Sequence, residues 1–525
     1  MEFETTNRDV LGRIGTLKTK SGVIETPHLF PVVNPAVQPV APREIREKMR
    51  CNAIMTNGYL IKNQFGEEAV RKGVHQVLDF EGVIAMDSGA YQLLTYGEIK
   101  ADPLKIARFE EEVAADIATI LDVPTGWDAT REYAEWTVKE TLTRADQTLA
   151  ALSRKDIAWV GPIQGGIYLD LLASSAREMA GKPFEILALG SPTQIMERYM
   201  FDKLVDMVLT AKMNIPFGKP LHLFGAGHPF MFAMAVALGC DLFDSAAYAI
   251  YARSGRYLTE YGTMKIDELQ HFPCSCPVCT SHEPKKVKEL GRGEWEKILA
   301  KHNLYVCLEE IRRVKQAILE GRLWELMELR AQSHPSLLQA LKRLKLYQDF
   351  IEKHSPSTKK RGMFYFGSQD LSRPEVVRHR KRITENYSPP EKAEILLLLP
   401  QSSARPYHKS PEIKRNLGRQ EDERIHTCVY AAPFGVVPLE IDDVYPLSQT
   451  ELVFPPDKET VSSATHAVVM YIRKNPYRTV VLVPEKEVWG KEIIEECKKI
   501  CKNTGKKFAL AKNSHTGKLI NPLTF

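Results

Sequence analysis

Eight short apolar runs alternate with longer amphipathic stretches over the first 250 residues of the chain. Such alternation is typical of repeated β/α units, in which parallel strands are joined by helices. The predicted strands are residues 28–33, 53–58, 83–89, 117–123, 158–166, 185–191, 220–227 and 240–246, and the clearest helical stretches are 103–115, 129–153, 169–179, 191–209 and 229–238. Eight units in about 250 residues match a TIM barrel, the (β/α)8 fold. A doubly wound sheet normally carries a glycine-rich phosphate turn after its first strand, and residues 33–37 contain no glycine.

Polar residues and glycines gather at the carboxyl ends of these runs. They occupy residues 56–58, 87–89, 122, 164–166, 190–191, 225–228 and 244–245. In a barrel all of these ends lie on one rim, where the active sites of this fold are built. Glycine, asparagine and aspartate also follow strands for reasons of turn chemistry alone. Their recurrence on most of the strands is what predicts an active site at this rim.

The composition excludes several classes of protein. With 44% hydrophobic and 26% charged residues, the 525-residue chain is predicted to be folded rather than disordered. The N-terminus has no basic segment followed by an apolar one, and no apolar stretch approaches the roughly 20 residues of a membrane span. We therefore expect no membrane association and a cytoplasmic location. Nine cysteines, three of them within six positions, favour metal ligation in a reducing compartment over a disulfide framework.

The sequence predicts two domains, residues 1–354 and 355–525. A polar, basic stretch at 354–362 separates them. Beyond it we expect a smaller α/β domain, with strands at 395–400, 427–433 and 479–484, helices at 462–474 and 488–504, and an irregular segment at 401–424. This domain has 28 Lys and Arg against 20 Asp and Glu, a net charge of +8, whereas residues 1–354 have 43 against 46, or −3. This excess of Lys and Arg in residues 355–525 is consistent either with binding of a polyanionic partner or with a solvated surface.

A cysteine cluster follows the predicted barrel. Cys274, Cys276 and Cys279 have the spacing C-x-C-x2-C and precede helical stretches at 293–302 and 306–321. Three thiolates and one imidazole complete a tetrahedral Zn2+ site. The candidates for the fourth ligand, between which spacing does not choose, are His302, His282, His271 and Cys307. Four protein ligands leave no open position, so we expect one structural zinc ion in an insertion at about 271–350.

Asp87 and Asp244 end the third and the eighth predicted strand, and each precedes a serine. Two carboxylates on one rim can take different catalytic roles. One can attack a carbon centre or stabilise a cation, while the other transfers a proton. Each aspartate could instead cap the helix that follows it. This pair is the candidate catalytic machinery.

Further rim residues suit the recognition of a planar base. Asp122, which closes the fourth predicted strand, can accept hydrogen bonds from paired N–H donors such as those on a guanine edge. Gln164 offers an amide beside Gly165 and Gly166, where only backbone limits the approach of a ligand. Tyr91 could stack on a base, although a core or rim aromatic is the alternative interpretation.

Several motifs occur together in one order. They are Asp-Ser-Gly-Ala-Tyr-Gln at 87–92, Gln-Gly-Gly at 164–166, Ala-Leu-Gly-Ser at 188–191, Leu-Phe-Gly-Ala-Gly-His-Pro at 223–229, Asp-Ser at 244–245 and the cysteine set with its downstream histidine. The chain thereby resembles the tRNA-guanine transglycosylases and, within them, the archaeosine type of archaea. The resemblance covers about residues 5–345 closely. It continues at 434–448, which looks like the accessory region of that family.

The resemblance implies that guanine at position 15 in the D-arm of tRNA is exchanged for 7-cyano-7-deazaguanine (preQ0), the first step towards archaeosine. Asp244 matches the nucleophile that attacks C1′ and holds the RNA covalently, and Asp87 matches the general acid and base. Among the zinc ligand candidates the resemblance selects His302. The residues that match the base-binding site are Asp122, Tyr91, Gln164 and Gly190.

The resemblance also implies partners. They are tRNA, guanine, preQ0 and a second copy of the chain in a homodimer. Tyr91 stands where the archaeal family more often has phenylalanine. Archaeal members end with a PUA RNA-binding domain, which is not recognisable here, so we expect either a separate PUA-domain protein or tRNA binding by the basic C-terminal third. The alternatives are a catalytically silent tRNA-binding relative, a queuosine-type enzyme acting on the anticodon, and a metal-dependent hydrolase.

Overall fold

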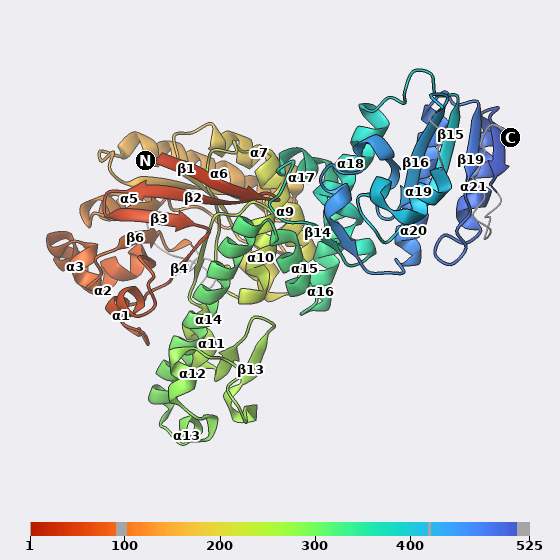
Figure 1. The fold of residues 1–525 in the computed structure, drawn as a ribbon. Coiled ribbons are helices and arrows are strands. Elements are labelled where there is room, and N and C mark those ends of the chain that lie inside the picture. The colour runs from red at the N-terminus through yellow and green to blue at the C-terminus, as the bar shows by residue number, and fades with distance from the viewer. Residues whose placement is uncertain (1, 91–101, 418–421, 512–525) are drawn as a thin grey trace. The chain divides into compact units, whose positions relative to one another are not determined.

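The computed structural model describes residues 2–90, 102–417 and 422–511 (Figure 1). The chain divides into two compact units, Met1–Leu344 and Lys345–Phe525. The division falls ten residues before the boundary predicted from the sequence. The reason is that α17 (Gln348–His354) is bound into the second unit, where Arg378 donates hydrogen bonds to Glu352 (2.7 Å) and to the carbonyl of Ser355 (2.9 Å).

The first unit is built on an eight-stranded parallel barrel sheet. Its strands are β4 (His28–Pro31), β5 (Ala53–Asn57), β6 (Val83–Asp87), β7 (Ile117–Thr119), β8 (Ala158–Ile163), β9 (Ile186–Leu189), β10 (Leu221–Leu223) and β11 (Leu242–Ser245). They pair in the order β4-β11-β10-β9-β8-β7-β6-β5, and a bridge between Val32 and Met55 joins the two ends of this order. Each predicted run contains one of these strands, and the predicted TIM barrel is confirmed.

A three-stranded antiparallel sheet covers the amino-terminal end of the barrel. It consists of β1 (Glu2–Asp9), β2 (Gly12–Thr19) and β3 (Gly22–Thr26), which the sequence analysis did not predict. Leu17 and Ile24 of this sheet are fully buried and pack with residues from the starts of barrel strands, among them Ala53, Val83 and Leu242. Apolar packing therefore closes one end of the barrel, and the polar residues of the strand ends lie at the other.

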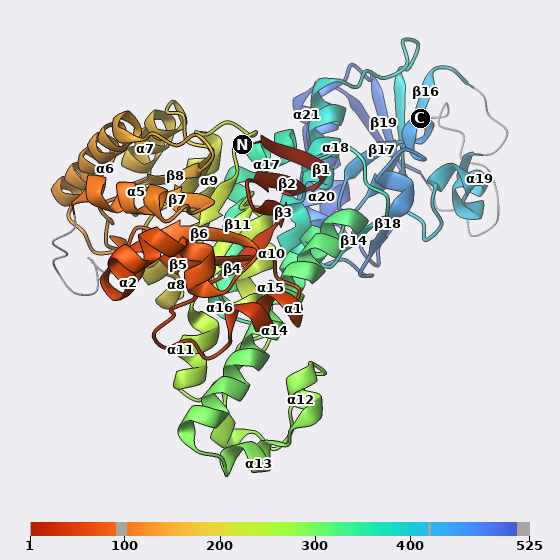
Figure 2. The same ribbon diagram turned by 90° about the vertical axis from the view of Figure 1, so that its left-hand side faces the viewer.

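Helices surround the barrel. They are α1 (Pro42–Glu47), α2 (Gly58–Lys72), α3 (Val74–Leu78), α5 (Pro103–Glu112), α6 (Arg131–Ala151), α7 (Leu169–Ala180), α8 (Thr193–Glu197), α9 (Phe201–Met213), α10 (Pro229–Ala237) and α11 (Ala247–Arg253). Figure 2 shows α5, α6 and α7 side by side outside the sheet. The prediction of a single helix at 191–209 is wrong. This segment forms two helices, α8 and α9, because Tyr199 between them adopts a left-handed φ of 57°.

The segment after the barrel holds a small subdomain and three helices. Its elements are β12 (Arg256–Leu258), β13 (Thr263–Lys265), α12 (Pro277–Ser281), α13 (Pro284–Lys288), α14 (Arg292–Glu320), α15 (Leu323–Ala331) and α16 (Pro335–Arg343). The two helical stretches predicted at 293–302 and 306–321 form the one helix α14, since no glycine or proline separates them. In the middle of α14, Asn303 accepts a hydrogen bond from Leu258 N (2.8 Å) and anchors the helix to β12.

The second unit has a mixed five-stranded sheet. Its strands are β15 (Ile395–Pro400), β16 (Ile425–Ala431), β17 (Gly435–Pro438), β19 (Thr479–Leu482) and β20 (Lys507–Leu510), in the order β17-β16-β15-β19-β20. Along β15, Leu396 and Leu398 join one buried cluster while Leu397 and Leu399 join another, so both faces of the sheet are covered. The remaining elements are β14 (Met363–Tyr365), β18 (Thr450–Leu452), α18 (Pro374–Glu385), α19 (Pro411–Leu417), α20 (Lys458–Lys474) and α21 (Glu492–Asn503).

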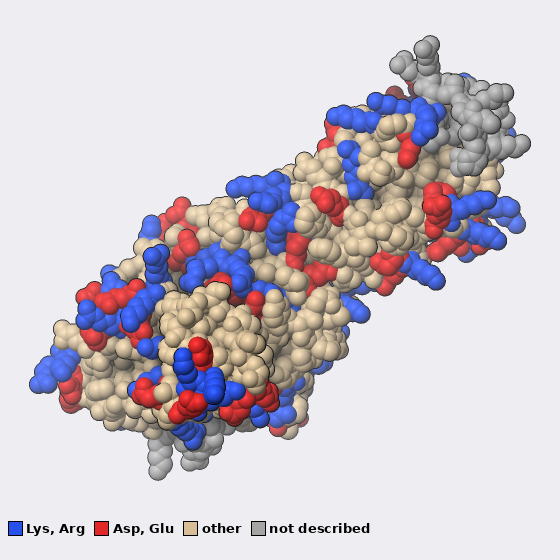
Figure 3. Space-filling model, turned by 60° about the horizontal axis from the view of Figure 1, so that its bottom comes forward, with Lys and Arg blue, Asp and Glu red and all other residues tan. Residues whose placement is uncertain are grey.

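The predicted strands and helices of this unit are present. Strands β17 and β20 were not predicted, and the segment predicted to be irregular contains α19. Across the face shown in Figure 3, Lys and Arg are interspersed with Asp and Glu on each unit. Within the described residues, no helix combines the length and the apolar character that crossing a membrane requires.

Candidate active site and metal centre

Three predicted carboxylates lie at the carboxyl ends of barrel strands. Asp87 is the last residue of β6, Asp122 follows β7 by three residues, and Asp244 is the third residue of β11. The charges of Asp244 and Asp122 both raise the pKa of Asp87, so the three side chains lie within electrostatic reach of one another. The fold therefore brings together residues that are up to 157 positions apart in the sequence.

The Asp244 side chain is held at one of its two oxygens. Its Oδ1 accepts hydrogen bonds from His222 Nε2 and from Gly225 N, both at 3.0 Å. Among the described residues, Oδ2 has no hydrogen-bond partner, and the side chain is 15% exposed. Asp244 does not cap α11, because that helix begins after Ala246. One oxygen is thus fixed while the other can reach a ligand.

Asp87 is half-buried and accepts a hydrogen bond from Asn57 Nδ2 at 2.9 Å. Burial, followed by the charges of Asp244 and Asp122, raises the pKa of Asp87 to about 7, against the lowering effect of hydrogen bonds from Gly89 and Asn57. A carboxyl group with this pKa is present in both protonation states near neutral pH. It can therefore donate or accept a proton there, as a general acid and base must.

Asp122 and Gln164 form a buried pair. Gln164 Nε2 donates to Asp122 Oδ2, and burial raises the pKa of Asp122 to about 6 against this hydrogen bond. Gln164 Oε1 accepts from Thr125 N (3.0 Å) and from Ser191 Oγ (3.1 Å), which fixes the orientation of the amide. Gly190 lies against this amide, since a Cβ there would be 2.2 Å from Gln164 Nε2.

Sequence reasoning missed the residues that orient these groups. His222 holds Asp244, Asn57 holds Asp87, and Ser191 holds Gln164 with its own backbone at a left-handed φ of 60°. The signal for His222 was available, because a histidine in the otherwise apolar run Leu-His-Leu of β10 is unusual. Tyr91, the predicted stacking residue, lies outside the described residues.

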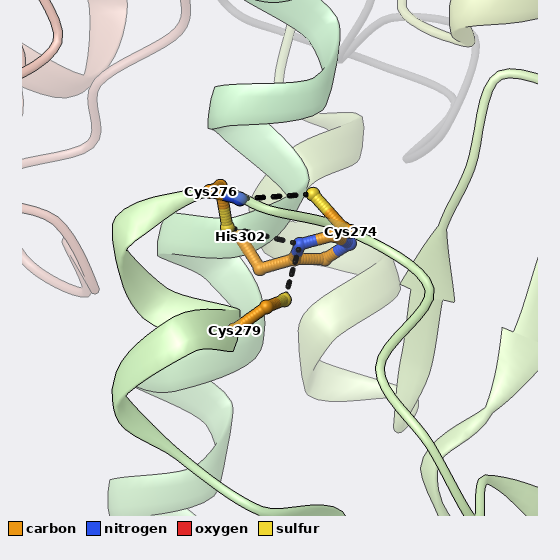
Figure 4. Close-up of side chains that lie close together, drawn as sticks. All are labelled: Cys274, Cys276, Cys279 and His302. Atoms are coloured by element: carbon orange, nitrogen blue, oxygen red, sulfur yellow. Dashed lines mark hydrogen bonds between the residues drawn. The ribbon is translucent and has the colours of Figure 1, made fainter.

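The predicted metal ligands form one cluster (Figure 4). The ligand atoms of Cys274, Cys276, Cys279 and His302 all lie within 4.8 Å of one another, and the set contains the sulfur and nitrogen donors that zinc prefers. His302 Nδ1 is 3.5 Å from Cys276 Sγ and 3.2 Å from Cys279 Sγ. The loop before α12, α12 itself and the helix α14 together could hold a metal ion.

Neighbouring groups orient the histidine towards the thiols. His302 Nε2 lies 2.9 Å from the carbonyl of Leu258 and donates to it, which leaves Nδ1 free to bind a metal. The ring of Tyr257 stacks on His302 at 3.6 Å, and its hydroxyl is 3.3 Å from Cys279 Sγ. The rival ligands are elsewhere: His282 contacts the Val278 carbonyl through Nδ1 (2.8 Å), Cys307 donates to the Gly227 carbonyl (3.4 Å), and His271 is not in the cluster.

Comparisons with known proteins agree with this architecture. A family model described as queuine tRNA-ribosyltransferase matches residues 9–336, and a second, described as a domain of unknown function, matches residues 376–521. A protein of Methanocaldococcus jannaschii is 41% identical over 485 residues, which are 90% of this chain and 72% of that protein. One of Sulfolobus acidocaldarius is 39% identical over 488 residues, 92% of this chain and 95% of that protein. Both relatives are named tRNA-guanine(15) transglycosylase.

Proposed function

Because the chain belongs to the tRNA-guanine transglycosylase family, which consists of pentosyltransferases, we propose that it exchanges guanine at position 15 of tRNA for preQ0 through a covalent aspartyl–ribosyl intermediate. The names of the relatives support the position and the base that is removed. The observation that carries the proposal is the group of three rim carboxylates, in which one has a free oxygen and another has a pKa of about 7.

In the proposed reaction Asp244 is the nucleophile. Its Oδ2 forms a bond to C1′ of the target nucleotide as the bond from C1′ to the guanine nitrogen breaks. Asp87 gives its proton to the departing guanine and later takes one from the incoming base, whose ring nitrogen then displaces Asp244 from C1′. One glycosidic bond is broken and one is formed, so the exchange needs no other reactant. Asn57 and His222 keep the two carboxylates in position for these steps.

The base would be read by Asp122 and Gln164. An ionised Asp122 can accept hydrogen bonds from the N–H groups of guanine or preQ0 through Oδ1, since Gln164 occupies Oδ2. The second hydrogen of Gln164 Nε2 is available for the carbonyl oxygen of the base. The same amide cannot rotate, because Thr125 and Ser191 both donate to Oε1. Tyr91 belongs to this proposed site as the residue that stacks on the base.

Gly190→Ala tests this base site. We expect kcat/KM for the free base to fall about 100-fold, because the added Cβ would lie 2.2 Å from Gln164 Nε2 and displace the amide. Steady-state exchange of labelled guanine measures the effect. Gly218→Ala is the matched control, since a Cβ at Gly218 meets nothing within 4 Å among the described residues. Equal activities of the two variants would contradict the assignment of Gln164.

The proposed partners follow from the family. They are tRNA, guanine, preQ0 and a second copy of the chain in a homodimer. The proposal also includes a cytoplasmic location, and a further tRNA contact made either by a separate PUA-domain protein or by the basic residues 355–525. The Cys274, Cys276, Cys279 and His302 cluster is proposed to hold one zinc ion. Four protein ligands give that ion a structural role, and the reaction above is carried by the carboxylates of the barrel.

The test of the function is base exchange with mapping of the product. Purified protein, an unmodified tRNA transcript and labelled guanine or preQ0 are incubated, and the labelled nucleotide is located by nuclease digestion. We expect label at position 15 only, and none in a transcript with adenine at that position. Label in the anticodon would favour a queuosine-type enzyme, whereas binding of tRNA without any exchange would favour a silent relative.

A further inference from the structure

An arginine and a tryptophan are stacked beside the proposed base site. The guanidinium carbon of Arg198 lies 4.0 Å from the centre of the Trp127 ring. Arg198 is exposed at the end of α8, and Trp127 is half-buried in the loop between β7 and α6. Neither residue takes part in the exchange chemistry described above. We call this pair the Trp127–Arg198 platform.

Hydrogen bonds tie the platform to the base site. The same loop contains Thr125, whose N–H donates to Gln164 Oε1 at 3.0 Å. Two residues further, Trp127 N–H donates to Gln194 Oε1 at 3.2 Å, which fixes the loop to α8. Ser191, in the chain that leads into α8, also donates to Gln164. The segments that carry Trp127 and Arg198 are thus both hydrogen-bonded to Gln164, the amide that is proposed to bind the target base.

Arg198 forms no ion pair with a carboxylate within the part of the chain that the structure describes. Another arginine, Arg131, also lies over an aromatic ring, that of Tyr168, at 5.7 Å. Arg131 contacts the carboxylates of Glu135 and Asp170. Arg198 has no such carboxylate partner among the described residues. An exposed guanidinium of this kind is free to contact a phosphate.

We propose that the Trp127–Arg198 platform binds a nucleotide next to the target nucleotide of the RNA substrate, with its base on the stacked pair and its phosphate at Arg198. The inference rests on the proposed function for its substrate. A nucleotide drawn out of a folded RNA leaves neighbours without their stacking partners, and aromatic rings and guanidinium planes can replace that stacking. The platform would thereby offset part of the cost of extracting the target base.

Binding of an unmodified tRNA transcript to the full chain tests the platform. We expect Trp127→Ala to raise the Kd by about 5- to 160-fold, the range that loss of one base–aromatic contact produces. Trp127→Phe should retain most of the affinity. Arg198→Ala should weaken binding and lower the slope of log Kd against log salt by about one unit, whereas Trp127→Ala should leave that slope unchanged. Arg131→Ala is the matched control and should alter the Kd less than 2-fold.

A transcript lacking the base of one neighbouring nucleotide identifies the contact. On the wild-type chain, loss of the correct base should cost as much affinity as Trp127→Ala, and the two changes together should cost no more than either alone. Additive losses at both neighbours of the target would overturn the proposal. An unchanged Kd of Arg198→Ala would also overturn the proposal. This variant provides the test if Trp127→Ala does not fold. Guanine exchange by the wild type is measured in parallel. Absence of exchange would count against the proposed function. Normal exchange by the wild type, together with an unchanged Kd of the platform variants, would count against the platform alone.

Discussion

Asp244→Ala is expected to abolish base exchange, with a loss of more than about 1,000-fold in kcat, because the variant has no oxygen that can bond to C1′. In the native chain Asp244 Oδ1 is fixed by His222 and Gly225, so only Oδ2 can act as the nucleophile. Exchange of labelled guanine into tRNA measures the loss. Asp146→Ala, which removes an exposed aspartate on the outer helix α6, is the control and should exchange at the wild-type rate.

A second measurement separates the nucleophile from a merely supporting residue. Mixing wild-type protein with tRNA in the absence of a free base should give a complex that survives denaturing electrophoresis, and Asp244→Ala should give none. Asp87→Asn should still react slowly to form that complex, since it removes proton transfer and not the attacking oxygen. A covalent complex in Asp244→Ala would contradict the assignment.

A different substitution of the same residue, Asp244→Asn, should alter the titration of Asp87. The charge of Asp244 raises the pKa of Asp87, so Asp244→Asn removes a negative neighbour and should lower that pKa from about 7. The midpoint of the Asp87 titration is therefore expected to move towards acidic pH. It can be followed by carboxyl carbon NMR of the Asp87 side chain, with Asp87→Asn used to assign the resonance. A shift to higher pH would mean that the two carboxylates do not interact as charges.

The barrel could be predicted from the sequence because its strands are buried on both faces. Each strand is then a short apolar run, and its end is marked by a polar residue or a glycine, as at Asp87 and Asp244. The sheet β1–β3 was missed because its first strand is largely exposed and shows no clear apolar run. The break at Tyr199 was missed as well, since a left-handed φ at tyrosine has no sequence signature.

The site was predictable in its residue types and not in its internal contacts. A carboxylate after a buried strand is visible in the sequence, and three candidate metal ligands follow from the spacing of Cys274, Cys276 and Cys279. The fourth candidate, His302, was selected by the family resemblance and not by spacing. The hydrogen bond from His222 to Asp244 joins two neighbouring strands of the sheet, and the requirement for glycine at 190 comes from the amide of Gln164. Both depend on the register and closure of the barrel, which a single sequence does not specify.

Loss of the proposed zinc ion should unfold the subdomain that contains α12 and α13. Purified protein should contain about one zinc ion per chain, measured by mass spectrometry of the metal. Cys279→Ser should reduce this content strongly, since it removes one of the four side chains that Figure 4 shows together and that are proposed to bind the ion. Structural zinc sites in small domains contribute about 10 kcal/mol or more to folding, so amide hydrogens of residues 256–288 should lose their protection from exchange.

Cys307→Ser is the matched control for this experiment. Cys307 is buried like Cys279, but it lies on α14, donates to the carbonyl of Gly227 and stands outside the cluster. Its serine variant should keep the metal and the protection of the subdomain. A chelator should likewise abolish protection and base exchange together, because the proposed ion would hold Cys274, Cys276 and Cys279 against His302 of α14. Loss of exchange with full protection would instead place the metal in the reaction, as a metal-dependent hydrolase would require.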